Sequence, residues 1–370
     1  ASLVPSAALL RAQLGFSFAR ASKTRLRIGY LSTDLCQHAV ACLIAELFEL
    51  HARQEFEVYA YSYGPDDGSV MRERLARTCD RFVDVRDISF QEAARRIHED
   101  RIDVLVDLNG YTKGARTEIL ALRPAPIQVN WLGYPGTMGA EFVDYIITDR
   151  FITPPGHEQF FSEQIVYLPE CYQVNDRKRK IASRTPTRRE MGLPEDGVVF
   201  CCFNNTFKIT SAVFDAWMRL LKKIPGSVLW LLEANSGALA NLRREAKARG
   251  VNPDRLVFAP KVSTDKHLAR FRLADLFLDT MPYNAHTTAS DALWAGLPVL
   301  TCAGETFASR VAGSLLTAIR LPELVTRSLS EYEAAAVRLA RDPSELAGMR
   351  RRLAKNRLTT PLFDSERFTR

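Results

Sequence analysis

Residues 276–302, LFLDTMPYNAHTTASDALWAGLPVLTC, contain the pattern that decides the fold. The apolar run Leu276–Asp279 predicts a strand, and the stretch from Thr287 predicts a helix that ends at Gly296 before Pro298 starts the next strand. Two strands connected through a helix lie parallel, and the helix covers one face of their sheet. This stretch therefore predicts an α/β protein with parallel strands.

The same alternation of apolar runs and helical patterns continues along most of the 370 residues. Further strands are expected at Arg27–Leu31, Phe56–Tyr63, Asp103–Leu108, Ile127–Leu132, Tyr145–Thr148, Gln164–Leu168, Val198–Phe203, Val228–Leu232, Leu256–Ala259 and Val299–Cys302. Helices are expected at Ala39–Ala52, Phe90–Asp100, Ser211–Lys223, Gly237–Arg249, His267–Leu273 and, within the opening stretch, Ala289–Ala295. Such alternation builds parallel sheets with helices on both faces.

The alternation stops between Pro169 and Pro194, where the residues are charged and lack apolar periodicity. We interpret residues 171–194 as a linker between two domains, which a chain of this length can accommodate. We expect two doubly wound lobes facing a cleft, with ligands bound beyond the carboxyl ends of the strands. The expected boundaries are 1–24 for an N-terminal helical remnant, 25–170 for the N-terminal lobe, 195–327 for the C-terminal lobe and 328–370 for C-terminal helices that break at Asp342-Pro343.

The composition excludes several classes of function. There are 50 Lys+Arg and 43 Asp+Glu, a net charge of +7, and much of the excess positive charge is local, in the runs Arg177–Lys180 and Arg350–Arg357. Runs of this kind are usually solvated surfaces, and no aromatic residues are interleaved with them, so a nucleic-acid partner is not expected. Because no stretch approaches the roughly 18 apolar residues that a membrane helix requires, no membrane span is expected either.

The cysteines and the missing motifs narrow the chemistry further. The seven Cys are scattered and form no Cys-x-x-Cys pair, which favours free thiols in a reducing cytoplasm over disulfides or zinc. The sequence has no Gly-x-Gly-x-x-Gly after a strand and no P-loop, so dinucleotide and P-loop sites are not favoured. No residues have metal-ligand spacing, so we expect no bound metal.

The start of the helix in the opening stretch is a candidate phosphate site. Thr287 and Thr288 place hydroxyl groups where the backbone N–H groups of a helix N-terminus favour anions. Asp291, four residues after Thr287, lies on the same helix face and can accept hydrogen bonds from ribose hydroxyls. The alternative is an ordinary threonine cap followed by a solvated aspartate.

Lys208 is a candidate partner for a diphosphate. It follows the predicted strand Val198–Phe203 in a polar loop, where an ammonium can offset the charge of a leaving group. The alternative is an ordinary surface lysine, with Asn204 and Asn205 forming a turn.

Three loops of the first lobe also follow predicted strands. His38, in the loop after Arg27–Leu31, can act as a base or bind a hydroxyl, although a helix-capping or core histidine is equally compatible with its position. The loop at 131–139 is rich in Gly and Pro, and its glycines allow the backbone to approach a ligand closely, unless they only form a tight turn. Residues 107–112 occupy the matching place after Asp103–Leu108.

Several ordered motifs resemble the protein O-GlcNAc transferase and SPINDLY family. They are RPAPIQ at 123–128, WLGYPGT at 131–137, DYIITD at 144–149, SVLWLL at 227–232, HTT at 286–288 and GETFASR at 304–310. The resemblance covers nearly the whole chain from Arg25 onward. It implies the family's GT-B fold of two Rossmann-like lobes, which agrees with the alternation described above.

The resemblance also implies roles for individual residues. His38 matches an active-site histidine near the donor sugar and the acceptor, and Lys208 matches the lysine that stabilises the departing nucleoside diphosphate. The remaining donor-side matches are His286, Thr287 and Thr288 at the pyrophosphate, Asp291 at the ribose, His267 on the uracil with Arg270 beside it, Val262 as a base contact, Asn205 in the lysine loop, and Gly133 and Pro135 under the sugar. Asp107 and Asn109 match positions near the acceptor.

The family's reaction is an inverting, metal-independent transfer of GlcNAc from UDP-GlcNAc to Ser or Thr hydroxyls of intracellular proteins. Either His38 or a phosphate oxygen of the donor takes the acceptor proton. The resemblance also implies tetratricopeptide repeats before Ala1, of which Ala7–Ala19 is a candidate remnant. It implies no cofactor beyond the donor.

The chain departs from the animal members at Asn205, Thr264 and Ala39, where those enzymes carry Gln, Lys and Pro, and it lacks their intervening domain. These differences fit a bacterial type and leave the donor open. The alternatives are an O-fucosyltransferase that uses GDP-fucose, a cytoplasmic protein N-glycosyltransferase, and a non-enzymatic sensor or scaffold that binds nucleotide sugar.

Overall fold

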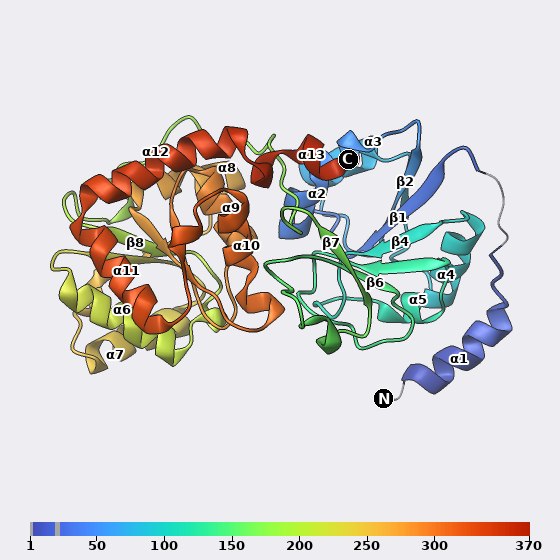
Figure 1. Ribbon diagram of the computed structural model, residues 1–370, viewed down its shortest axis with the longest axis horizontal. Helices are drawn as coiled ribbons and strands as arrows, with labels where there is room; N and C mark the ends of the chain where they lie inside the picture. The colour runs from blue at the N-terminus through green and yellow to red at the C-terminus, as the bar shows by residue number, and fades with distance from the viewer. Residues whose placement is uncertain (1–2, 19–22) are drawn as a thin grey trace. The chain divides into compact units, whose positions relative to one another are not determined.

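The strands of the computed structural model form two sheets, one in each of two units, and their pairings are parallel (Figure 1). The structure describes residues 3–18 and 23–370. The predicted N-terminal segment 1–24 therefore lies outside the described residues at 1–2 and 19–22. Unit 1 comprises Ala1–Arg177 and Asp364–Arg370, and unit 2 comprises Lys178–Phe363. Each unit has the parallel α/β architecture that the sequence predicts.

The sheet of unit 1 has the strand order β3-β2-β1-β4-β5-β6-β7. Its strands are β1 (Leu26–Ser32), β2 (Phe56–Ser62), β3 (Arg81–Asp84), β4 (Val104–Asp107), β5 (Ile127–Asn130), β6 (Tyr145–Asp149) and β7 (Gln164–Leu168). Its helices are α1 (Leu3–Leu14), α2 (Ala39–Leu50), α3 (Val70–Thr78), α4 (Phe90–Glu99), α5 (Thr117–Ala121) and α13 (Ser365–Thr369).

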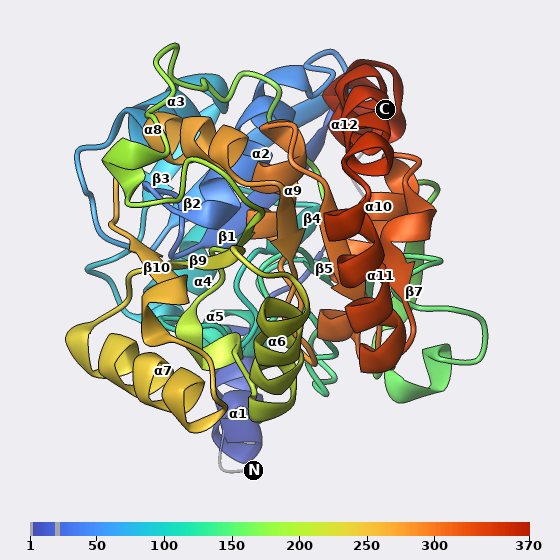
Figure 2. The ribbon, with the colours of Figure 1, turned by 90° about the vertical axis from the view of Figure 1, so that its left-hand side faces the viewer.

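The sheet of unit 2 has the order β10-β9-β8-β11-β12-β13. Its strands are β8 (Val199–Cys202), β9 (Val228–Leu232), β10 (Leu256–Ala259), β11 (Leu276–Leu278), β12 (Val299–Cys302) and β13 (Val325–Thr326). Its helices are α6 (Ser211–Lys223), α7 (Ser236–Ala248), α8 (Thr264–Arg270), α9 (Thr287–Trp294), α10 (Val311–Ala318), α11 (Leu329–Arg341) and α12 (Pro343–Thr359). Helices α6 and α7 cover one face, and α8 and α9 cover the other (Figure 2).

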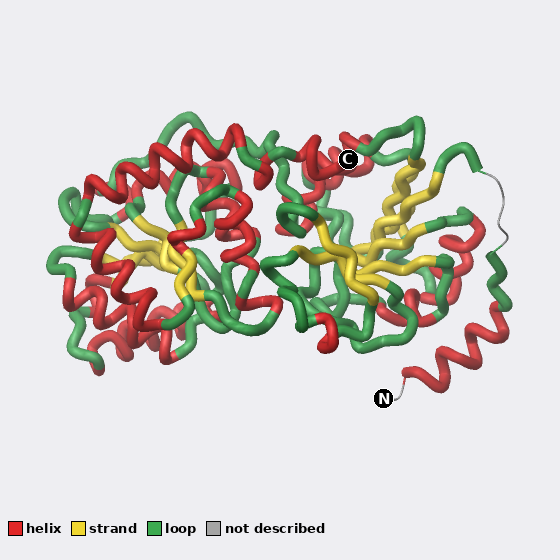
Figure 3. Tube along the Cα trace, viewed as in Figure 1, coloured by secondary structure: helices red, strands yellow, loops and turns green. Residues whose placement is uncertain are grey.

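Burial on both faces explains why the strands are apolar runs rather than alternating patterns. In each unit the strands lie inside and the helices outside (Figure 3), and all four residues of β8 and of β12 are buried. The strands β3 and β13, which lie at sheet edges, are not predicted from the sequence. β3 reads RFVD with both ends exposed, and β13 has 2 residues, so neither presents an apolar run.

Each sheet has one point where the strand order reverses, between β1 and β4 in unit 1 and between β8 and β11 in unit 2. At such a point the loops after the two neighbouring strands turn away from each other and leave a crevice at the carboxyl edge. These two crevices are where each unit can bind a ligand.

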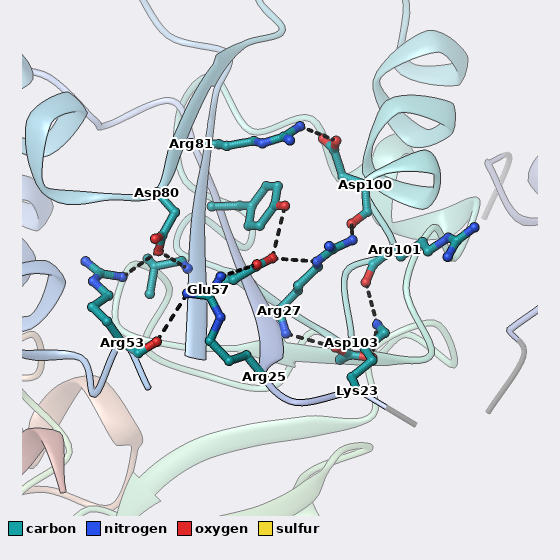
Figure 4. A network of polar contacts seen from close by, with 12 residues as sticks. Lys23, Arg25, Arg27, Arg53, Glu57, Asp80, Arg81, Asp100, Arg101 and Asp103 are labelled. Carbon is teal, nitrogen blue, oxygen red and sulfur yellow. Dashed lines mark hydrogen bonds and ion pairs between the residues drawn. The ribbon is translucent and has the colours of Figure 1, made fainter. Parts of the chain in front are cut away.

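The opposite, amino edge of the unit 1 sheet holds a network of paired charges (Figure 4). Arg25 and Arg27 bind the two carboxylate oxygens of Glu57 at 2.5 and 2.6 Å, and Lys23 binds Asp103 at 2.7 Å. The network ties the starts of β1 and β2 together, and each of these basic groups has a carboxylate partner.

The basic run Arg177–Lys180 in the predicted linker is not wholly solvated, and the expectation of a solvated run is wrong for Arg179. Unit 1 ends at Arg177, inside the segment 171–194. Asn175 and Asp176 are buried, and Asp176 accepts from Arg74 at 2.5 Å. Lys178 and Lys180 are exposed but Arg179 is buried. The chain turns at residues 177 and 178, and on either side of this turn Arg177 pairs with Glu46 and Arg179 pairs with Asp291.

The C-terminal residues are also divided between the units. The break at Asp342-Pro343 is confirmed, because Asp342 caps α12 through hydrogen bonds from Ser344 N and Glu345 N. Residues 364–370, however, belong to unit 1, where α13 packs on α2. Ser365 Oγ donates to the buried Glu46 of α2 at 2.7 Å, which fixes the returning chain there.

The basic run Arg350–Arg357 is likewise not a wholly solvated face. Arg350 donates to the backbone oxygen of Asp275 at 3.2 Å. Arg357 donates to the backbone oxygen of Trp294 and lies 5.4 Å from the centre of its ring. These arginines hold α12 against the rest of unit 2. Among the residues that the structure describes, no helix is both long and apolar enough to cross a membrane.

Candidate active site

The crevice of unit 2 is built around Asp279, the first residue after β11. Its buried carboxylate accepts hydrogen bonds from Thr301 Oγ1 at 2.6 Å, Thr280 N at 2.7 Å and Ala285 N at 2.6 Å. Asn204, the second residue after β8, donates to Thr280 Oγ1 at 2.8 Å. Asp279 therefore shapes the loop that leads into α9 and ties it to the end of β8.

Lys208 reaches into this crevice from the short 3₁₀ helix Thr206–Lys208. Its Nζ donates to the backbone oxygen of Asn284 at 2.9 Å and lies 4.0 Å from the centre of the Tyr283 ring. Within residues 3–18 and 23–370, no carboxylate forms an ion pair with Lys208. Burial lowers the pKa of Lys208 to about 8, while Asp279 acts in the opposite direction. A largely buried ammonium without an anionic partner is suited to bind an anionic ligand.

The start of α9 lies beside this ammonium. His286 precedes the first helical residue, Thr287, and its side chain does not cap the helix. Its ring stacks on the Tyr283 ring with centres 4.9 Å apart, and its Nε2 lies 3.3 Å from the backbone oxygen of Ala308. Burial, followed by the charge of Lys208, lowers the pKa of His286 to about 3. His286 is therefore neutral, and because a carbonyl only accepts, Nε2 carries the proton.

His267 and Arg270, on one face of α8, form an aromatic cluster with Phe203 and Phe271. The ring centre of His267 is 5.4 Å from that of Phe203 and 5.0 Å from that of Phe271. Arg270 binds His267 Nδ1 and lies over the Phe203 ring at 4.5 Å. Burial lowers the pKa of His267 to about 3, so its uncharged ring is suited to stack on a planar base.

Two other residues that were predicted to bind the nucleotide sugar lie at the surface of unit 2. Val262 is 44% exposed in the loop before α8. Asn205 is exposed, and its backbone oxygen accepts from Lys208 N at 3.0 Å. The neighbouring Asn204 is buried and donates to Asp279 and Thr280 in the crevice. The Oδ1 atoms of Asn204 and of Asn284 have no hydrogen-bond partner among the described residues.

Asp291 lies one turn into α9 and pairs with Arg179. Arg179 belongs to the basic run Arg177–Lys180, which was expected to be solvated. Burial raises the pKa of Asp291, and Arg179 opposes this shift. The carboxylate is thus held by the protein as well as available to a ligand, since its side chain remains 17% exposed.

The crevice of unit 1 brings together His38, Asp34 and Asn109. Asn109 is buried, and it accepts from Ser32 Oγ at 2.7 Å and donates to Asp34 Oδ2 at 3.0 Å. Asp34 Oδ2 lies 3.5 Å from Nδ1 of His38, whose side chain is 46% exposed. Nδ1 also accepts from Val40 N at 3.3 Å, so His38 caps α2, the alternative that its position allowed.

Asp107 shapes the loop after β4 from within. It is 3% exposed and accepts from Gly110 N at 2.7 Å and Asn109 N at 3.2 Å. Burial raises the pKa of Asp107 to about 6. The structure thus buries Asp107 under the crevice, where it holds Asn109 in place.

Gly133 and Pro135 lie in the loop after β5, next to the loop after β4. A Cβ on Gly133 would lie 1.8 Å from the backbone oxygen of Leu108. The glycine is required because two chain segments of unit 1 touch there. The close approach that the sequence suggested therefore exists between two loops of the protein itself.

Comparison with known proteins identifies the family. The sequence profile of Glycosyl transferase family 41 matches residues 7–186 and 182–370. The chain belongs to this family. It is 42% identical over 352 residues to the probable UDP-N-acetylglucosamine–peptide N-acetylglucosaminyltransferase SEC of Arabidopsis thaliana, covering 94% of this chain and 36% of that protein. It is 32% identical to a UDP-N-acetylglucosamine–peptide N-acetylglucosaminyltransferase of Caenorhabditis elegans, covering 93% of this chain and 40% of that protein.

Solved structures agree with this family. A mutant O-GlcNAc transferase of Thermobaculum terrenum matches with a TM-score of 0.88 and 32% identity over 99% of this chain and 70% of that chain. The glycosyltransferase WaaG of lipopolysaccharide biosynthesis matches with a TM-score of 0.56 at 13% identity over 92% of this chain and 98% of that chain, which shows a shared fold. The family 41 chain therefore has the GT-B fold. It spans no more than about two fifths of the length of the curated relatives named above.

The structure adds residues that the motifs did not reveal. Asp279, Tyr283 and Asn284 shape the crevice of unit 2, and Asp34 and Arg179 hold predicted site residues. Asp279 could have been predicted from the sequence, because it is a lone carboxylate that directly follows a buried strand. Arg179 could not have been predicted, because its partner Asp291 is 112 residues away.

Proposed function

We propose that this family 41 protein is an inverting, metal-independent glycosyltransferase that moves GlcNAc from UDP-GlcNAc to Ser or Thr hydroxyls of proteins. One observation carries the proposal: the ammonium of Lys208 has no carboxylate partner among the described residues and lies next to the loop that begins α9. This combination of a cation and a helix N-terminus suits the diphosphate of a nucleotide sugar.

Lys208 and the first turn of α9 stabilise the leaving group. As the bond between the anomeric carbon and the diphosphate oxygen breaks, negative charge grows on that oxygen, and a preorganised donor there lowers the barrier. The neutral His286 can act beside them through a hydrogen bond. Its low pKa means that it adds no second positive charge.

The nucleoside is held by the neighbouring parts of unit 2. The uncharged His267 ring can stack on the uracil, and the free oxygen of Asp291 can accept hydrogen bonds from the ribose. We favour a uridine donor over GDP-fucose because the relatives at 42% and 32% identity are named as UDP-N-acetylglucosamine transferases.

The acceptor hydroxyl attacks the anomeric carbon on the face opposite the diphosphate and forms the new C–O bond. Its proton passes to His38 or to a phosphate oxygen of the donor. For Nε2 of His38 to accept it, the histidine must carry its own proton on Nδ1, facing Asp34 at 3.5 Å. Because Val40 N donates to Nδ1 at 3.3 Å, the resting histidine favours the other tautomer, which supports the phosphate oxygen as an alternative base.

We also propose that the protein works in the cytoplasm. All seven cysteines are free thiols, as expected for a reducing compartment.

A donor panel tests the proposal. Purified protein is incubated with a peptide library and UDP-GlcNAc, GDP-fucose or UDP-glucose, with and without a chelator, and products are located by mass spectrometry. We expect GlcNAc on Ser or Thr, unaffected by the chelator. Transfer from GDP-fucose alone, or to Asn, would identify one of the other glycosyltransferases, and binding of UDP-GlcNAc without transfer from any donor would favour a sensor.

A further inference from the structure

Arg179 lies along α9, the helix that begins at the candidate phosphate site. Its guanidinium pairs with Asp291 Oδ1, Nη2 lies 3.4 Å from Ser290 Oγ, and the group is 5.9 Å from the centre of the Trp294 ring. In return, Trp294 Nε1 donates to the backbone oxygen of Arg179 at 3.2 Å. Three positions on one side of α9 thus hold Arg179, whose side chain is 4% exposed.

Arg177, two residues earlier, makes the matching contact in unit 1. Its Nη2 donates to Glu46 Oε1 at 2.9 Å and its backbone N donates to Glu46 Oε2 at 2.8 Å. Glu46 is on α2, the helix that begins after His38. Each arginine therefore pairs with a buried or partly buried carboxylate on a different helix, and unit 1 ends between them.

The carboxylates of Glu46 and Asp291 differ in whether an oxygen remains without a hydrogen-bond partner. Glu46 uses both oxygens on Arg177 and also accepts from Ser365, so it has a purely structural set of partners. Asp291 gives Oδ1 to Arg179, and its Oδ2 has no hydrogen-bond partner within the described parts of the chain. That oxygen is the one a ligand can use.

We propose that Arg179 is a positioning residue for Asp291, which it keeps ionised and oriented so that Oδ2 accepts hydrogen bonds from the ribose hydroxyls of the donor. This inference rests on the proposed function, because it assumes a nucleotide donor. Arg179 itself does not touch the ligand. It acts through the carboxylate and through the side of α9 to which it binds.

The charges around this pair come from the elements packed on α9. On α8, Arg270 and His267 bind each other, and His267 is neutral. On α12, Arg357 lies over the Trp294 ring. Burial raises the pKa of Asp291 and Arg179 lowers it, so loss of Arg179 favours the protonated carboxyl. A protonated Asp291 is a weaker acceptor for the two hydroxyls.

The experiment measures binding of UDP and of 2′,3′-dideoxy-UDP by calorimetry between pH 5.5 and pH 8. It compares the wild type, Arg179→Met, Arg179→Lys and, as the matched control, Arg177→Met. For the wild type we expect UDP to bind more tightly than the dideoxy compound at every pH. For Arg179→Met we expect about tenfold weaker UDP binding at neutral pH, the effect of losing one charge-assisted hydrogen bond.

Two signatures separate positioning from general damage to the fold. In Arg179→Met the preference for UDP over dideoxy-UDP should largely disappear, and UDP binding should strengthen as the pH rises through the raised pKa of Asp291. Arg179→Lys should restore part of both effects, and Arg177→Met should retain the wild-type preference. Equal weakening of both ligands in Arg179→Met and Arg179→Lys, or unchanged UDP binding, would overturn the inference. A wild type that binds neither compound would instead disprove the proposed function on which it rests.

Discussion

At the carboxyl edge of unit 1, between β1 and β4, acidic and amide side chains surround an exposed imidazole, whereas the corresponding edge of unit 2 presents an ammonium and a helix start. Both sheets are parallel and both edges lie where the strand order reverses. In unit 1, Asp107 and Asp34 hold Asn109, and Asp34 also faces His38. In unit 2, Asp279 holds the loop beside Lys208. The topology supplies a crevice in each unit, and the side chains decide which ligand it can take.

The paired charges at the amino edge of unit 1 sharpen this contrast. Arg25 and Arg27 each bind one carboxylate oxygen of Glu57, so both guanidinium groups have a carboxylate partner within the protein. At the crevice of unit 2, Lys208 has a carbonyl and an aromatic ring as partners. A satisfied network serves the fold, while an unsatisfied cation is available to a ligand at some cost in stability.

Replacing Lys208 should produce the largest effect. We expect Lys208→Met to lower the transfer rate by about 10²–10³-fold, the usual effect of losing one donor to a developing anion. The same variant should be more stable than the wild type at pH 7, because the pKa of Lys208 is lowered on folding to about 8 and the charged form is therefore disfavoured in the folded state. Initial rates and thermal melts measure both effects, with the exposed Lys222→Met as the control.

The size of the stability difference between Lys208→Met and the wild type depends on pH. Between pH 8 and the ordinary lysine pKa, the unfolded state binds more protons, so wild-type stability rises with pH there and the advantage of the variant shrinks. A variant with lost activity and lost stability would contradict the contrast between a functional and a structural cation.

The histidine of unit 1 should have the next largest effect. If His38 is the base, His38→Ala should lower the rate by about 10²-fold. Asp34→Asn should lower the rate less, because Asp34 faces Nδ1 of His38 but does not take the proton. Binding of UDP by calorimetry is the control and should not change. A small rate effect of His38→Ala would assign the proton to the donor phosphate.

Gly133 tests the contact between the loops after β4 and β5. Gly133→Ala places a Cβ against the backbone oxygen of Leu108 and should cost about 1–3 kcal/mol of unfolding free energy, as overpacking usually does. Gly136→Ala is the matched control, since its Cβ would find its nearest neighbour at 3.5 Å, on the Tyr134 ring. Equal melting temperatures for the two variants would show that the loops can separate without cost.

The amino-edge network should give the smallest effect. Glu57 is 19% exposed, so after solvent screening we expect Glu57→Gln to cost about 0.5–1 kcal/mol at pH 7. The arginines lower the pKa of Glu57 on folding, so this contribution is present above the ordinary glutamate pKa and is lost as the pH falls through the lowered value. Denaturant unfolding at pH 7 and at pH 3 checks it, and a difference that grows at low pH would contradict the ion-pair interpretation.

Local sequence patterns were enough to predict the parallel α/β class, most of the strands and the helix that starts at Thr287. These features depend on local periodicity, because a strand buried on both faces must be apolar over its whole length. The motif order also identified the family, which the comparisons confirm. Individual chemical groups such as Lys208 and His38 were found because they lie in the loops after such strands.

The pairing of charged side chains, in contrast, could be seen only in the folded chain. The sequence places Arg177 and Arg179 in one basic run, yet the chain buries Arg179 against Asp291 and pairs Arg177 with Glu46, 131 residues away. It likewise could not show that residues 364–370 return to unit 1. Local patterns report how much of each segment is buried, whereas partners so distant along the chain are set by how the sheets and helices pack.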